Sequence, residues 1–204
     1  MFYVMYAISH YLKDESRKAT EKYLKETTGA DLVTTLKIVN RPHAGLKILV
    51  GSLPEFDFPL EKPDHLIPCG PILRHAPPLS ESDPELLEWV KKAPTVYINL
   101  GSICHIEEPQ GVELALALKQ LIDAYSAKNP ESPRIQVIWK LRKYGEWSHE
   151  AGSRVYEILG KEIEEDQVRT VNWLKAEPVS LLNSGHVVCQ VHHGGSNSFH
   201  EALK

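Results

Sequence analysis

The stretch from Val187 to Glu201 reads Val-Val-Cys-Gln-Val-His-His-Gly-Gly-Ser-Asn-Ser-Phe-His-Glu. Its apolar opening, residues 187–191, predicts a buried strand, and the glycine pair that follows ends the strand. A helix is predicted to begin at Ser196. A strand that passes through a glycine turn into a helix is the repeating unit of α/β proteins, so this stretch indicates the fold class.

The same alternation of strand and helix runs through the residues before it. Short apolar runs predict strands at residues 95–100, 135–139 and 168–173, and helical periodicity predicts helices at residues 111–127, 150–165 and 178–183. Repeated alternation of this kind predicts an α/β fold, a Rossmann-like parallel sheet with helices on both faces.

The N-terminal part of the chain has a different character. Asp14–Thr28 is predicted to form a helix that gains apolar contacts from Leu12, Tyr23 and Leu24 and ends at Gly29. Met1–Ile8 is expected to be a buried element and Leu46–Gly51 a buried strand, whereas Asp31–Val39 fits a helix end or a short strand equally well. Prolines are dense from Pro54 to Pro84, which favours an extended linker, placed at residues 68–90.

Composition and charge exclude several classes of protein. The chain has 204 residues and a net charge of −4, with scattered basic residues, so we expect no nucleic-acid partner. Its three cysteines, Cys69, Cys104 and Cys189, are widely spaced and odd in number, which favours reduced thiols and a cytoplasmic location. No apolar run reaches the roughly 18–20 residues of a membrane span.

The turn after residues 187–191 has the residues of an anion site. The side chains and backbone N–H groups expected to meet a phosphate are those of His193, Gly194, Gly195, Ser196, Asn197 and Ser198. Glu201 follows Asn197 by four residues, hence by one helical turn of about 5.4 Å, a suitable step from a pyrophosphate to its ribose. The same residues also fit a plain helix start, with Ser196 as the N-cap and Glu201 as a solvated charge.

Two other segments also favour a nucleotide-binding site. Gly101-Ser102 ends the strand predicted at residues 95–100 and offers a second phosphate-facing loop. Trp173 ends the strand predicted at residues 168–173, where its ring is suited to stacking on a base; a core or rim aromatic is the alternative.

Together these residues resemble the nucleotide-sugar-binding domain of the family 1, UDP-dependent glycosyltransferases, which have the two-domain GT-B fold. The run from His193 to Glu201 is similar to the second half of the family's signature box, H-x-G-x-N-S-x-x-E. The resemblance implies that His193, Ser196, Asn197 and Ser198 hold the pyrophosphate and Glu201 the ribose. It also implies that Trp173 stacks on uracil and that Ser102 lies near the phosphate or the acceptor cleft.

The resemblance also implies a domain organisation and a set of ligands. Residues 1–67 would be the tail of an N-terminal acceptor-binding domain and residues 91–204 a nucleotide-sugar-binding domain that is incomplete at its C-terminus. The family's catalytic His–Asp pair has no counterpart here, so no catalytic residue is assigned, and His10 is not given that role. The expected ligands are a UDP-sugar donor and a small-molecule acceptor, with no cofactor and no metal. After Trp173 the chain reads Leu174-Lys175-Ala176, so the family's Pro-Gln is absent beside the position expected for the base.

Three alternatives stay open from the sequence. A GT-B-type epimerase or phosphorylase would grip phosphate at a similar turn. The histidines near the turn offer a metal site, formed by His186, His192, His193 and His200. A non-catalytic remnant of a transferase would retain nucleotide binding without turnover.

Overall fold

The computed structural model describes residues 10–34, 46–56, 58–59 and 61–203. The chain divides into two units, residues 1–50 with 60–67 and residues 51–59 with 68–204. The expected apolar element at Met1–Ile8, and the part of Asp31–Val39 beyond residue 34, lie outside the described residues. The domain boundaries expected from the sequence stay a prediction.

Helix α2 (Glu15–Thr28) confirms the helix predicted in the first unit. The Asp14 carboxylate caps it by accepting a hydrogen bond from the Arg17 N–H at 3.2 Å, and Gly29 ends it with a φ of 71°, which a residue without a side chain adopts freely. The prediction that Leu12 and Tyr23 make apolar contacts is wrong, because these side chains are 57% and 65% exposed.

Strands β1 (Ile48–Val50) and β2 (Leu66–Pro68) form a two-stranded sheet, and a short 3₁₀ helix, η1 (Pro54–Phe56), follows β1. The strand expected at Leu46–Gly51 is therefore present. Its expected burial is wrong, since Leu49 is 63% exposed. A two-stranded ribbon gives its side chains few neighbours to pack against.

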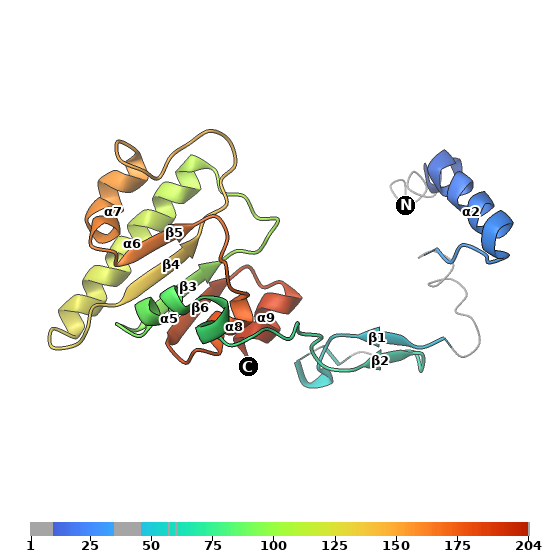
Figure 1. Ribbon diagram of the computed structural model, residues 1–204, viewed down its shortest axis with the longest axis horizontal. Coiled ribbons are helices and arrows are strands. Elements are labelled where there is room, and N and C mark those ends of the chain that lie inside the picture. Colours follow the sequence, from blue (N-terminus) through green and yellow to red (C-terminus); the bar gives the residue numbers. More distant parts are fainter. Residues whose placement is uncertain (1–9, 35–45, 57, 60, 204) are drawn as a thin grey trace. The chain divides into compact units, whose positions relative to one another are not determined.

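The second unit holds a parallel sheet of strand order β5-β4-β3-β6 (Figure 1). Its strands are β3 (Thr95–Asn99), β4 (Gln136–Lys140), β5 (Val168–Val171) and β6 (Val187–His192). All four strands were predicted from their apolar runs. β3 and β4 are buried along their whole length, as expected for strands that have a neighbour on each side and helices above and below.

Helices cover both faces of this sheet, which confirms the predicted fold class (Figure 1). One face carries α6 (Glu108–Lys128) and α7 (Arg154–Glu164), and the other carries α4 (Leu79–Ser82), α5 (Pro84–Val90), α8 (Pro178–Leu182) and α9 (Ser196–Ala202). Residues 68–90 were expected to be an extended linker. The last part of this range is helical instead: it forms α4 and α5, which bury Leu79, Trp89 and Val90 against the sheet.

The apolar core consists of one cluster on each face. Under α6 and α7 it joins strand residues such as Val96 and Val137 to the predicted apolar stripe of α6, represented by Ala115 and Leu118. Under α5 and α8 it joins Tyr97 and Ile138 to Trp89 and Leu181. No helix in the described part of the chain is both long enough and apolar enough to cross a bilayer.

Strand β6 differs most from its prediction. It was expected to be buried, but in the described residues it pairs only with β3, and Val188 and Val191 are 62% and 40% exposed. An apolar run shows that a strand forms, but its burial depends on the position it takes in the sheet.

Candidate functional site

The site predicted from the sequence lies at the carboxyl ends of β3 and β6. The chain passes from β3 outward to β4 and β5 on one side, and β6 then pairs with β3 on the other side. The connections therefore reverse direction between β3 and β6, and open α/β sheets bind ligands in the crevice outside the strand ends at such a point. The loops that follow these two strands are residues 100–107 and 193–195.

The His193 imidazole lies between two glycines that are far apart in the sequence. A Cβ atom added to Gly101 would lie 2.7 Å from His193 Cε1, and one added to Gly195 would clash with the ring at Nε2. Gly101 also has a φ of 89°, a conformation that L-residues rarely adopt. Both glycines are therefore required for the ring to occupy this place, and the predicted loops at Gly101-Ser102 and His193–Gly195 meet around it.

Asn99 holds the loop after β3 in place. The sequence patterns did not predict it as a site residue. Its side chain is 3% exposed, and its Oδ1 accepts a hydrogen bond from the Gly101 N–H at 3.1 Å. This bond turns the chain directly after β3. The sequence could have indicated Asn99 through its place, because it is a polar residue at the carboxyl end of a strand predicted to be buried.

Helix α9 carries the rest of the predicted phosphate residues. Gly195 is its N-cap and offers no side-chain cap, and Ser196 and Asn197 are exposed on its first turn. Ser198 is only 7% exposed, so its side chain faces the protein interior. The His200 ring is also buried, and its Nδ1 lies 2.8 Å from the Ser196 carbonyl.

Trp173 lies just beyond β5 and is 62% exposed, so it is not a core aromatic. The Lys140 ammonium lies 3.7 Å from its ring centroid and the Arg142 guanidinium carbon 5.9 Å from it. Arg142 also donates a hydrogen bond to the Ser102 carbonyl, so it links the loop after β3 to the ring. Lys140 and Arg142 were missed from the sequence, although Lys140 directly follows the strand predicted at residues 135–139.

Burial and neighbouring charges shift the pKa values of two groups here. Lys140 is 7% exposed, and burial, with the positive charge of Arg142, lowers the pKa of its ammonium. Burial, with the negative charge of Glu177, raises the pKa of the Glu201 carboxyl. The charge of each group opposes the pKa shift of the other, so the Lys140 ammonium and the Glu201 carboxylate favour each other's charged forms.

The described histidines near the turn, His186, His192, His193 and His200, do not form a metal centre. Within the described ranges, no three His, Cys, Asp or Glu side chains are grouped to hold a metal ion. His192 accepts a hydrogen bond at Nδ1 from the Gly194 N–H, at 3.2 Å, and His200 is held against Ser196. The Nδ1 atoms of His192 and His200 are therefore engaged in hydrogen bonds within the turn and the first turns of α9.

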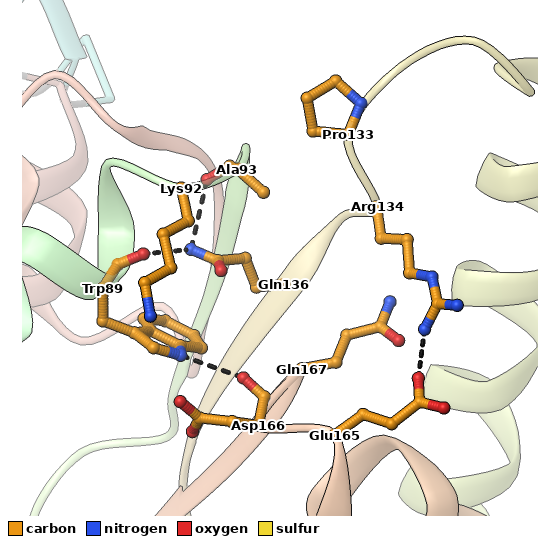
Figure 2. A pocket seen from close by; sticks show the side chains of 9 residues that line it. All are labelled: Trp89, Lys92, Ala93, Pro133, Arg134, Gln136, Glu165, Asp166 and Gln167. Carbon is orange, nitrogen blue, oxygen red and sulfur yellow. Dashed lines mark hydrogen bonds and ion pairs between the residues drawn. The ribbon is translucent and has the colours of Figure 1, made fainter.

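A separate pocket of 230 Å³ lies at the opposite, amino-terminal end of the sheet (Figure 2). Its lining residues are Trp89, Lys92, Ala93, Pro133, Arg134, Gln136, Glu165, Asp166 and Gln167. Figure 2 shows these groups bonded to one another: Gln136 donates to the Trp89 and Ala93 carbonyls, Trp89 donates to the Asp166 carbonyl, and Arg134 pairs with Glu165. These bonds hold the loops before β3, β4 and β5 together.

Comparison with known proteins identifies a protein that is similar in sequence. The chain is similar to glycosyltransferase sdnJ of Sordaria araneosa, with 40% identity over 159 residues. The matched region covers 78% of this chain and 30% of that protein, so the chain spans about a third of the relative's length. No family model matches the chain.

Proposed function

We propose that this chain binds the nucleotide of a UDP-sugar as the donor-binding part of a glycosyltransferase. The observation that carries the proposal is the His193 ring held between Gly101 and Gly195, where the carboxyl ends of β3 and β6 meet. A ring N–H at this position is suited to donate a hydrogen bond to a diphosphate. Gly194, where an added Cβ would have no atom within 4 Å, leaves room for a phosphate to approach the backbone.

The surrounding residues suit the remaining parts of a nucleotide. Lys140 and Arg142 supply positive charge beside the turn, and the exposed Trp173 ring offers a flat surface for a base. Glu201 lies on α9 beyond Asn197, where its carboxylate is suited to accept hydrogen bonds from ribose hydroxyls. The glycosyltransferase name of the relative supports sugar transfer as the chemistry. UDP and the GT-B arrangement are proposed from the motif His193–Glu201.

In the proposed reaction an acceptor hydroxyl oxygen forms a bond to the anomeric carbon, and the bond from that carbon to the diphosphate breaks with inversion. The hydroxyl proton passes to a general base, for which no residue of this chain is assigned. The role of this chain is to hold the diphosphate and to stabilise the negative charge that develops on it as it leaves. His193, Lys140 and the N–H groups at the start of α9 are the groups proposed for that task.

Titration calorimetry of the 204-residue chain with UDP tests the proposal. We expect saturable binding, and we expect His193→Ala to weaken it by about tenfold or more, which corresponds to about 1.4 kcal/mol. His186→Ala is the matched control, because His186 immediately precedes β6 and so lies at the other end of the same strand. The absence of UDP binding at about 1 mM, a free energy of about −4.1 kcal/mol, would refute the proposal.

A further inference from the structure

Two side chains whose polar atoms are buried lie next to each other in the sheet; Tyr97 is buried as a whole and Gln190 is half-buried. Tyr97 of β3 and Gln190 of β6 are direct neighbours in the parallel register, so their side chains leave the same face of the sheet. That face is the one covered by α8 and α9, since Tyr97 packs with Leu181 of α8.

The polar atoms of this pair have no hydrogen-bond partner among the described residues. The Tyr97 hydroxyl and both the Nε2 and the Oε1 of Gln190 are buried in this state. Buried polar groups in proteins are nearly always bonded, and each exception calls for a physical reason. An apolar residue at either position would have satisfied the packing requirement alone.

Glu201 is the charged group that adjoins this pair. It lines a cavity of 210 Å³ between β6, α8 and α9, together with Gln190. Its negative charge also acts on Tyr97: burial and then Glu201 raise the pKa of the Tyr97 hydroxyl, whereas the neighbouring Asn99 side chain lowers it. A phenol O–H and an amide N–H are donors, and an ionised carboxylate accepts several hydrogen bonds, so the three groups are complementary.

We propose that Tyr97 and Gln190 are positioning residues that orient the Glu201 carboxylate toward the ribose. In this arrangement they donate to the inner carboxylate oxygen, and the outer oxygen is left to accept from the ribose hydroxyls. The pair thereby sets the preference of the site for a ribonucleotide over a 2′-deoxyribonucleotide. The inference rests on the proposed nucleotide site and on Glu201 as its ribose contact.

The test compares the affinities of the full chain for UDP and for 2′-deoxy-UDP by titration calorimetry. We expect the wild-type chain to prefer UDP by about tenfold or more, since hydrogen bonds to a charged group are among the stronger ones. Tyr97→Phe and Gln190→Met keep the size of each side chain and remove its donor. Each is expected to reduce the ratio of the two affinities at least threefold.

Two further variants separate positioning from a general structural effect. Glu201→Ala is expected to bring the ratio close to one, and adding Gln190→Met to it is expected to change the ratio no further. Val191→Ala is the control, because Val191 is the next residue on β6, its side chain points to the other face, and it should leave the ratio unchanged. Thermal melting of each variant confirms that it is folded.

The outcomes distinguish the inference from the function on which it rests. If the wild-type chain binds neither nucleotide, the proposed function and the inference both fail. If it binds both equally, nucleotide binding stands and the role of Glu201, with the inference, is overturned. If the wild-type chain prefers UDP and the folded Tyr97 and Gln190 variants keep the same ratio, the inference alone is overturned.

Discussion

The two faces of the four-stranded sheet differ in what fills them. Against α6 and α7, residues such as Val137 and Leu159 belong to one continuous apolar cluster. The opposite face begins in the same way, with Ile138 and Leu181, but toward the carboxyl ends of its strands it carries Tyr97, Lys140 and Gln190.

This difference separates stability from ligand binding within one sheet. Burial of the apolar side chains under α6 and α7 lowers the free energy of the folded state. That side also holds the buried Glu162, which pairs with Lys119 of α6 at 2.8 Å, and the Trp139 indole N–H, but both lie away from the proposed site. Buried polar groups such as Lys140 and Gln190 cost stability, so their position beside the proposed site is best explained by what they do there. The following predictions test this separation in order of expected effect.

The largest effect is expected on the apolar face. Leu159→Ala removes a side chain that is 0% exposed, and we expect the free energy of unfolding to fall by about 2–5 kcal/mol because a cavity remains. Urea denaturation measures this loss. Leu121→Ala on α6 is the control, since Leu121 is 40% exposed and should cost much less. Folded Leu159→Ala protein should bind UDP as the wild-type chain does; a large loss of affinity would contradict the separation of the two faces.

A substitution beside His193 should affect both binding and stability. Gly101→Ala places a Cβ 2.7 Å from His193 Cε1 at a residue with a φ of 89°. We expect UDP affinity to fall by about tenfold and stability by about 1–3 kcal/mol, measured by calorimetry and by urea denaturation.

Gly145→Ala is the matched control for this substitution. Gly145 has a φ of 79°, but a Cβ there would have no atom within 4 Å. It should therefore lose stability through backbone strain and keep its UDP affinity. Equal losses of affinity in the two variants would show that the His193 contact is not what matters.

The third prediction concerns pH. Burial and Glu177 raise the pKa of Glu201 above its ordinary value of 4.5, so the carboxylate takes up a proton at a higher pH than an exposed one does. UDP affinity of the wild-type chain should therefore fall as the pH is lowered through that raised pKa. In Glu201→Gln this part of the pH dependence should disappear, which calorimetry over a pH series measures.

The same shift predicts the sign of a stability effect. A raised pKa in the folded state means that folding is favoured when Glu201 is protonated, and this advantage is lost as the pH rises through the folded pKa. Glu201→Gln should therefore be the more stable protein at neutral pH, with an advantage that vanishes below about pH 4.5. A variant that is less stable at neutral pH would contradict the assigned environment of Glu201.

The smallest effect is expected at the protein surface on the side of the sheet that carries Tyr97, Lys140 and Gln190. Arg74 and Glu177 form an ion pair at 2.7 Å, but the Arg74 side chain is 80% exposed. Arg74→Ala should change the free energy of unfolding by less than about 1 kcal/mol, because water screens exposed pairs. Urea denaturation at low and high salt checks this, and a larger change would mean that the pair supports the site beneath it.

Much of the fold was predictable from local patterns. Residues 95–100 and 135–139 are apolar enough to be central strands, and the helix at 14–28 has its stop at Gly29. Predictions of burial failed at Leu49 and Val188, because a strand is buried only if the remainder of the sheet and its helices surround it. Within the site, the turn from His193 to Ser196 was predictable because its residues are consecutive, whereas Lys140 and Asn99 reach it from other strands.

The sequence by itself determined the alternation of strand and helix, the parallel α/β class and the glycine turn before Ser196, because side-chain periodicity and glycine placement act over a few neighbouring residues. Only the tertiary structure decided that β6 lies beside β3. That strand order places His193 between Gly101 and Gly195 and makes Tyr97 a neighbour of Gln190. Contacts between residues so distant in the chain depend on how whole strands and helices pack, which no local pattern encodes.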